Sequence, residues 1–230
     1  MNIFEKKIKI VMLGDINVGK TSLTKRISLN HKYNHKNNYT STIGVGYITK
    51  QYNINFLDEN YKIYIEIWDT AGQERYRSLI PMYYHNSDVA VIIYDITDYN
   101  TFNSVKMWCS EIFENSDIKL IIIVGNKFDL KCNVPSITVL NFISNIQQKY
   151  IDGPEYVFIE TSAKTGHNVS ILLDKIVNKI LLHRLKEIKY IENNTSESEL
   201  LTNDQNIIHL DNNWNKIFTY DYYKNCCSYN

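Results

Sequence analysis

The sequence predicts an α/β protein with a six-stranded, mostly parallel sheet covered by helices on both faces. Two observations favour this fold class. Short apolar runs that stop at turn residues recur along the chain, and segments with helical spacing of apolar residues separate most of them. Strands that alternate with helices build such a sheet, and ligands bind where the carboxyl ends of its strands open into loops.

Six runs are predicted to be strands and three segments to be helices. The predicted strands are residues 7–13, 47–56, 61–68, 89–94, 120–124 and 156–159, and the second and third form a hairpin around residues 58–60. The predicted helices are residues 21–30, 102–113 and 171–188. The polar stretch 31–41 is predicted to be a long loop.

The composition is typical of a soluble globular protein. The chain has 230 residues, of which 44% are hydrophobic and 22% are charged. Its 25 Lys and Arg residues balance 25 Asp and Glu residues, which argues against a nucleic-acid binder that depends on bulk charge. No apolar run approaches the ~20 residues of a membrane span. Four cysteines in a chain of this length indicate a reducing compartment rather than a disulfide framework.

Charge and periodicity together divide the chain into a domain, residues 1–190, and a flexible tail, residues 191–230. The tail has six acidic and two basic residues, a net charge of −4, which leaves +4 for residues 1–190. Asn, Ser, Glu and Asp dominate the tail, and helical periodicity fails from about Ile191. Apolar residues such as Trp214 and Phe218 leave open the alternative that part of the tail docks on a partner.

Residues 14–21, the phosphate loop, fit the pattern G-x-x-x-x-G-K-[ST] and lie between a predicted strand and a predicted helix. In this context the backbone N–H groups of the turn converge on phosphates, and the following helix points its positive end at them. Lys20 supplies a positive charge, and the Thr21 hydroxyl can coordinate Mg²⁺. The predicted phosphate contacts are Gly14, Asn17, Val18, Gly19, Lys20, Thr21 and Ser22.

The segment N-K-F-D, residues 126–129, predicts that the bound base is guanine. The Asp129 carboxylate can accept two hydrogen bonds from N1–H and the 2-amino group of guanine, which adenine cannot supply. Such a site rejects the wrong base by roughly 10⁴ or more. Asn126 and Lys127 belong to the same predicted pocket, and Ser162, Ala163 and Lys164 follow the last predicted strand and form its other side.

The segment D-T-A-G-Q, residues 69–73, follows another predicted strand. Asp69 is predicted to hold Mg²⁺, through water. Gly72 lets a backbone N–H approach the γ-phosphate because no side chain is in the way. Gln73 is suited to orienting an attacking water.

These motifs resemble the Rab family of Ras-like small GTPases. The segments W-D-T-A-G-Q-E-R-Y-R-S-L (68–79), S-T-I-G-V (41–45) and E-T-S-A-K (160–164) are similar to switch II, the end of switch I and the base-binding motif of Rab proteins. The similarity extends from about Ile8 to Leu185. It implies the three-layer, P-loop small GTPase fold and a monomer that binds GTP and GDP with Mg²⁺.

The resemblance also implies roles for single residues and a set of partners. Thr42 would bind Mg²⁺ and sense the γ-phosphate, and Gln73 would be the catalytic residue of GTP hydrolysis. Tyr47, Trp68 and Tyr83 would form the aromatic surface that effectors read, rather than only core. The implied partners are an exchange factor, a GTPase-activating protein, effectors and the carrier proteins of prenylated Rabs.

Cys226 and Cys227 resemble the paired cysteines that carry two geranylgeranyl groups in Rab proteins. They do not form a C-a-a-X motif. Two lipid chains give lasting attachment, whereas one gives only marginal binding. The expected location is the cytoplasmic face of endomembranes, with cycling through the cytosol. Sequence features favour endosomes, with the Golgi as the alternative.

The chain departs from the family pattern at several positions. Switch I is three residues longer than usual, so the aromatic that covers the guanine edge is not at its usual place, and Tyr33 is predicted to replace it. Gly46, His85 and Asn86 alter the surface that partners read. Ile16 occupies a position where bulk can crowd Gln73, which predicts slow hydrolysis.

Two other functions fit part of the sequence. A static nucleotide-binding scaffold would share the phosphate loop, but Thr42, Asp69 and Gln73 favour a cycling switch. A P-loop kinase for a small molecule would also share that loop. The N-K-F-D and D-T-A-G-Q segments and the lack of a lid segment argue against the kinase.

Overall fold

The protein is described by a computed structural model that covers residues 3–29, 42, 44–56, 59–72, 79–150 and 153–196. Its contacts divide the chain into two units, Met1–Lys186 and Glu187–Asn230. The first unit contains the sheet. Of the second unit, only residues up to Ser196 are described, as part of a helix that begins in the first unit. The predicted tail therefore lies mostly outside the described residues, and its division from the domain at residue 190 stays a prediction.

Six strands form one sheet in the order β2-β3-β1-β4-β5-β6. The strands are β1 (Ile3–Leu13), β2 (Val45–Phe56), β3 (Glu59–Thr70), β4 (Val89–Asp95), β5 (Leu120–Asn126) and β6 (Glu155–Glu160). Only the β2–β3 pair is antiparallel; the four other pairings are parallel. The prediction of a six-stranded, mostly parallel sheet is confirmed.

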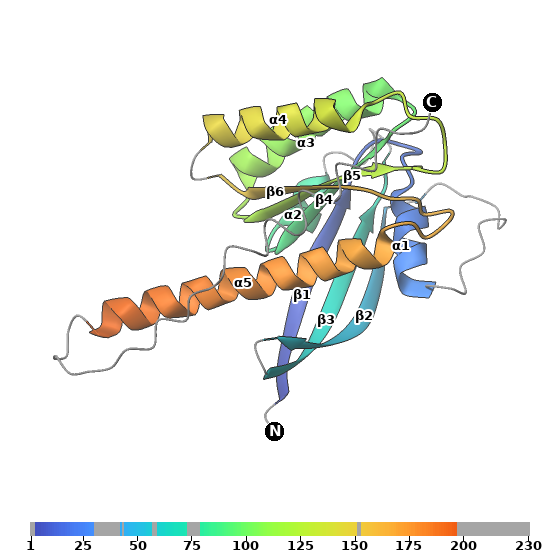
Figure 1. Cartoon of the computed structure of the whole chain (residues 1–230). Helices are drawn as coiled ribbons and strands as arrows, with labels where there is room; N and C mark the ends of the chain where they lie inside the picture. The colour runs from blue at the N-terminus through green and yellow to red at the C-terminus, as the bar shows by residue number, and fades with distance from the viewer. Residues whose placement is uncertain are drawn as a thin grey trace. The chain divides into compact units, whose positions relative to one another are not determined.

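Helices cover both faces of the sheet (Figure 1). They are α1 (Lys20–Leu29), α2 (Ile80–Tyr84), α3 (Tyr99–Asn115), α4 (Ser136–Lys149) and α5 (Val169–Ser196). Side chains of α1 and α5 pack on one face, and side chains of α2, α3 and α4 pack on the other. Helix α5 continues past Ile191, where the sequence periodicity fails, and ends at Ser196.

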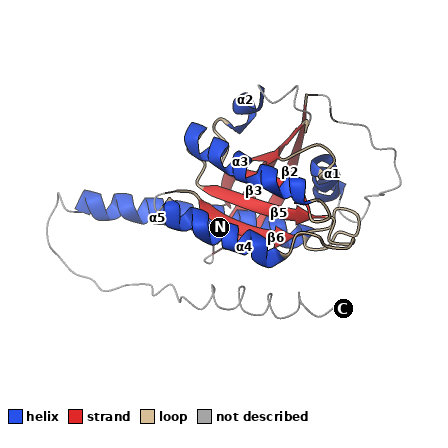
Figure 2. Cartoon of the chain, turned by 90° about the horizontal axis from the view of Figure 1, so that it is seen from above, coloured by secondary structure: helices blue, strands red, loops and turns tan. Residues whose placement is uncertain are grey.

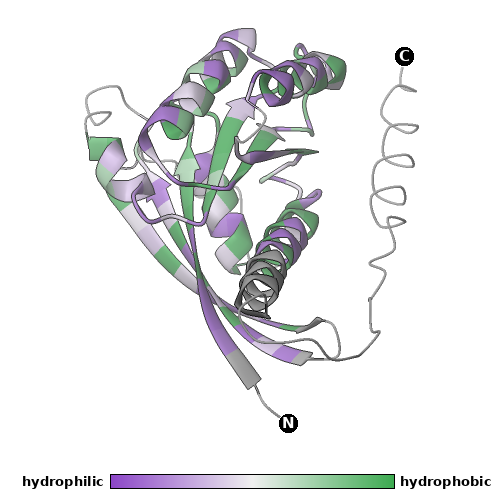
Figure 3. Cartoon of the chain, turned by 90° about the vertical axis from the view of Figure 1, so that its left-hand side faces the viewer, coloured by the Kyte–Doolittle hydropathy of each residue, from purple (hydrophilic) through white to green (hydrophobic). Residues whose placement is uncertain are grey.

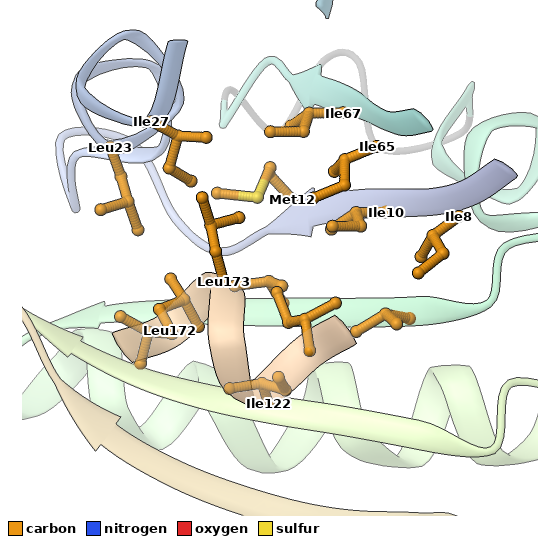
Figure 4. Close-up of a cluster of buried hydrophobic side chains, with 14 of the residues drawn as sticks. Ile8, Ile10, Met12, Leu23, Ile27, Ile65, Ile67, Ile122, Leu172 and Leu173 are labelled. Carbon is orange, nitrogen blue, oxygen red and sulfur yellow. The ribbon is translucent and has the colours of Figure 1, made fainter. Parts of the chain in front are cut away.

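Alternation along the strands gives each layer its core. In β1, Ile8, Ile10 and Met12 point toward α1 and α5, and Val11 and Leu13 belong to the opposite cluster (Figure 4). Strands β4 and β5 are buried along their whole length, as expected of central parallel strands. Figure 3 shows these apolar strands in green between helices that carry polar, purple residues.

The sequence-predicted elements are present with shifted ends, and two helices were not predicted. Strand β1 begins at Ile3 rather than residue 7, and β3 and β5 extend two residues beyond their predicted ends. Helices α2 and α4 are additional. None of the helices in the described part of the chain is long and apolar enough to cross a membrane.

Candidate functional site: a nucleotide-binding edge of the sheet

The loops that follow β1, β3, β5 and β6 bring the sequence motifs together. These four strands run parallel, so their carboxyl ends meet at one edge of the sheet. In Figure 2 tan loops at this end of the sheet gather beside α1. The edge holds the phosphate loop, Asp69 and the base pocket, which we define as residues 126–129 and 162–164.

The phosphate loop closes as a tight turn between β1 and α1. Gly14, Asn17 and Gly19 have φ values of +133°, +64° and +97°, a region that glycine adopts freely and asparagine tolerates. A Cβ at Gly14 would strike the carbonyl oxygen of Ile93, and one at Gly19 would strike the Asn126 amide. The turn delivers the chain to the N-terminus of α1 at Lys20, where free N–H groups and the helix dipole favour an anion.

Lys20 is held in place before any phosphate contacts it. Its side chain is only 5% exposed, and Nζ donates hydrogen bonds to the carbonyl oxygens of Gly14 at 2.8 Å and Asp15 at 2.7 Å. Burial lowers the pKa of Lys20 to about 8, although Asp69 and Asp15 oppose the shift. A phosphate bound here would therefore meet an ammonium group that is already desolvated and oriented.

Gly72 packs against this loop so closely that only glycine fits. A Cβ at Gly72 would contact Lys20 Nζ and lie 2.6 Å from the Asp15 carbonyl oxygen. The backbone of the D-T-A-G segment therefore lies directly against Lys20.

Thr21, Thr42 and Asp69 form a corner of oxygen donors that fits Mg²⁺. The two threonine hydroxyl oxygens are 2.6 Å apart. Asp69 is buried, and its Oδ1 has no hydrogen-bond partner among the residues that the structure describes. Burial raises the pKa of Asp69, although a hydrogen bond from Thr21 and the charge of Lys20 act in the opposite direction. An orphaned carboxylate oxygen beside two hydroxyl groups matches the hard donor set that Mg²⁺ prefers.

Asn126 joins the phosphate loop to the base pocket. Its Nδ2 donates to the Val18 carbonyl oxygen at 2.9 Å, and its Oδ1 accepts from the Ala163 amide at 3.1 Å. The side chain is 2% exposed. Its geometry therefore suits a positioning residue that ties three loops together.

Asp129 is held in place by two side chains that follow β6. Its Oδ1 accepts a hydrogen bond from Ser162 Oγ at 2.6 Å, and its Oδ2 lies 3.5 Å from Lys164 Nζ. Burial opposes ionisation, but Ser162 and Lys164 hold the pKa of Asp129 below its usual range. The carboxylate is thus fixed and ionised at neutral pH, as recognition of guanine N–H groups requires.

Two supports of the base pocket were not predicted from the sequence. Asp95, at the end of β4, forms a 2.5 Å ion pair with Lys127 Nζ. Arg26, on α1, donates through Nε to the Ala163 carbonyl oxygen at 2.7 Å and also bonds the Lys164 carbonyl oxygen. An acidic residue at the carboxyl end of a buried strand is a signal that could have identified Asp95. Arg26 leaves no comparable signal because its partners are 137 and 138 residues away in the chain.

Tyr47, Trp68 and Tyr83 form one aromatic row beside the site. The Tyr47 and Trp68 ring centroids are 5.2 Å apart, and those of Trp68 and Tyr83 are 6.2 Å apart. Tyr47 is 52% exposed, whereas Trp68 and Tyr83 are partly buried. The structure thus brings the three predicted residues together on a surface that a partner can reach.

Several predicted residues lie outside the described residues. These are Tyr33, Gln73, Cys226 and Cys227. Two other predicted residues are described. Ser22 lies in the first turn of α1, and the exposed side chain of Lys164 contacts the Asp129 carboxylate. Cys109 is buried in α3, and Cys132 is exposed.

Comparison with known proteins identifies the family of this chain. The Ras family profile matches residues 9–182. The putative ras-related protein Rab-5B of Dictyostelium discoideum is 38% identical over 182 residues, which cover 78% of each chain. The GTP-binding protein ypt5 of Schizosaccharomyces pombe is 38% identical over 175 residues, 76% of this chain and 78% of the relative. The human Ras-related protein Rab-22A is 36% identical over 176 residues, 76% of this chain and 84% of the relative.

The extent of these matches confirms the resemblance drawn from the motifs, and with it the fold class. The chain belongs to the Ras family and is a Rab-like small GTPase, an enzyme that binds and hydrolyses GTP.

Proposed function

We propose that this GTPase is a Mg²⁺-dependent switch whose GTP-bound form recruits effectors at the cytoplasmic face of endosomal membranes. The observation that carries the proposal is the contact between the Thr21 and Thr42 hydroxyl groups. Thr42 lies shortly before β2, and β2 contributes Tyr47 to the aromatic row. A ligand that engages Thr42 therefore acts on the strand that a partner would read.

Each part of the edge has a role in this cycle. The phosphate loop and Lys20 bind the β- and γ-phosphates, and Asp129 selects guanine. Thr21, Thr42 and Asp69 would hold Mg²⁺, which would neutralise charge on the phosphates. Gln73 orients the water that attacks the γ-phosphate, and the products are GDP and inorganic phosphate.

Nucleotide assays on the purified full-length chain test the switch. Wild-type protein is expected to convert bound GTP to GDP in Mg²⁺, and the fluorescence of Trp68 is expected to change during that conversion. Thr42→Ala should retain GDP and lose most of this signal, and Trp68→Phe should remove it. No hydrolysis at long times would instead support a static nucleotide-binding scaffold.

The proposal also includes where the protein acts and which proteins act on it. The named relatives include Rab-5B and Rab-22A, which belong to the endosomal Rabs, and this favours endosomes over the Golgi. An exchange factor, a GTPase-activating protein, effectors and a carrier for the prenylated form would act on a monomer. Lipids on Cys226 and Cys227 would provide attachment to the membrane.

Imaging tests the attachment. A tagged chain is expected to overlap endosomal markers, and Cys226→Ser/Cys227→Ser is expected to become diffuse. Cys132→Ser is a matched control because Cys132 is an exposed cysteine in the folded domain. Overlap with Golgi markers would replace the endosomal assignment, and an unchanged distribution of the paired variant would rule out these cysteines as the anchor.

A further inference from the structure

A stacked aromatic pair lies at the rim of the base pocket. The rings of Phe128 and His167 have centroids 4.8 Å apart and planes only 10° apart. Phe128 is 38% exposed and His167 is also exposed. The pair is therefore not part of either hydrophobic core.

The backbone of each ring residue bonds to the segment that follows β6. Phe128 stands between Lys127 and Asp129, and its N–H donates to the Thr161 carbonyl oxygen at 3.0 Å. The His167 carbonyl oxygen accepts from the Ser162 N–H at 3.1 Å. The stack thus bridges the loop after β5 and the loop after β6, the two segments that form the pocket.

Both loops have left-handed backbone directly beside the stacked residues. Lys127, which precedes Phe128, has φ +69°, and Asn168, which follows His167, has φ +56°. Gly166, which precedes His167, has φ +88°. Left-handed backbone at non-glycine residues persists where surrounding contacts hold it in place. A ring stack between the two loops supplies such a contact.

We propose that Phe128 and His167 are positioning residues that keep the base pocket closed and thereby set how long a guanine nucleotide stays bound. This inference rests on the proposed base pocket at Asp129. Neither ring is assigned a contact with the base. The stack acts by holding Lys127 and Asp129 on one loop in register with Ser162 on the other.

The test measures release of fluorescent GDP from the full-length protein in excess unlabelled GDP. Phe128→Ala and His167→Ala are each expected to release GDP roughly three- to tenfold faster, a range that corresponds to the coupling of an aromatic pair. The double variant should release GDP no faster than the quicker single variant, because either change removes the same contact. His167→Phe should restore slow release because it can stack on Phe128.

A second aromatic pair, away from the base pocket, provides a matched control. Phe113, near the end of α3, is 36% exposed and packs on Tyr150 with ring centroids 4.2 Å apart. Phe113→Ala should lower the unfolding temperature without changing GDP release. His167→Gln gives a second way to remove the stack if an alanine variant does not fold.

The outcomes separate this inference from the pocket itself. Wild-type release rates in every stacking variant, with altered unfolding temperatures only, would refute the positioning role and leave the pocket intact. Additive effects of the two single changes would refute it as well. Wild-type protein that fails to retain GDP would refute the pocket, and the inference with it.

Discussion

The Asp95 carboxylate lies 2.5 Å from the ammonium group of Lys127, the lysine of the N-K-F-D segment. Asp95 is itself fixed by hydrogen bonds from the Thr97 N–H at 2.9 Å and the Thr97 hydroxyl at 2.7 Å. Burial opposes ionisation of Asp95, but Lys127 and Thr97 hold its pKa below its usual range. Strand β4 therefore supports a base-pocket residue that belongs to the loop after β5.

Removing the charge of Asp95 should shorten the lifetime of bound GDP. In Asp95→Asn, Lys127 keeps its left-handed backbone but loses its ionic partner. We expect release of fluorescent GDP to be roughly five- to tenfold faster, equivalent to about 1–1.4 kcal/mol, with an unchanged association rate. Asp98→Asn is the control because Asp98 is exposed and caps α3 instead. Equal release rates for Asp95→Asn and wild type would show that the ion pair does not support the pocket.

Gly72→Ala should damage hydrolysis more than GDP binding. The added methyl carbon would lie 2.6 Å from the Asp15 carbonyl oxygen, so either the phosphate loop or the Gly72 backbone must shift. Where the Gly72 backbone is what shifts, GDP affinity should change little, because GDP lacks the γ-phosphate that this backbone is predicted to approach. We expect single-turnover hydrolysis to fall about a hundredfold, as when one transition-state hydrogen bond is lost.

Gly46→Ala is the control for the slower hydrolysis expected of Gly72→Ala. A Cβ at Gly46 would make only ordinary contacts, at 3.5 Å or more, with Asp69. This variant should hydrolyse GTP at close to the wild-type rate. A similar rate in Gly72→Ala would mean that the close approach of Gly72 is not needed for hydrolysis.

Substitutions of Ile16 test whether a bulky side chain on the phosphate loop slows GTP hydrolysis. Its side chain is 45% exposed at the nucleotide-binding edge. If it crowds Gln73 or the water that Gln73 orients, Ile16→Gly should raise the single-turnover hydrolysis rate several-fold. Ile16→Leu keeps the bulk and should hydrolyse at the wild-type rate. A glycine variant with an unaltered rate removes crowding as the explanation.

A cluster remote from the site should make stability depend on pH. Glu155 bonds Lys179, and its Oε2 lies 3.1 Å from His183 Nε2. Burial alone would raise the pKa of Glu155. Lys179 and His183 lower it by more, so the pKa of Glu155 lies below its ordinary value of 4.5. A carboxylate with a depressed folded-state pKa stabilises the fold above its unfolded pKa, and this contribution is lost as the pH falls through the folded value.

Glu155→Gln should therefore be less stable than wild type at neutral pH, by up to about 1 kcal/mol for a partly exposed cluster. The difference in the free energy of unfolding should shrink below about pH 4.5. Urea unfolding at several pH values measures it. Glu114→Gln, an exposed change on α3, should show no such dependence. A constant difference across the range would contradict the assignment.

Local pattern and motif chemistry explain what the sequence could predict. The strands and the phosphate loop were predictable because apolar runs, glycine positions and the lysine at the start of α1 are all constraints between near neighbours in sequence. Helix α2 was not, since its five residues are too few for a helical period. In α4, Val139, Ile143 and Ile146 have helical spacing and are buried, but residues of low helix propensity obscure the pattern.

The supports of the site depend on which loops become neighbours in space. Arg26 meets Ala163, Asp95 meets Lys127, and Phe128 meets His167 only after the parallel strands align their carboxyl ends. No single stretch of sequence specifies these pairs. The residues that would contact the nucleotide follow from motifs, whereas the residues that hold them follow from topology.

The most direct test of the account compares guanine and xanthine nucleotides on Asp129→Asn. Wild-type protein should prefer GDP over XDP by roughly 10⁴ because the Asp129 carboxylate accepts two N–H groups that only guanine offers. An amide supplies one acceptor and one donor, which matches xanthine, so the variant should lose GDP affinity and gain XDP affinity. If Asp129→Asn kept the wild-type preference for GDP, the pocket would not be built around Asp129 and the assignment of the nucleotide-binding edge would be wrong.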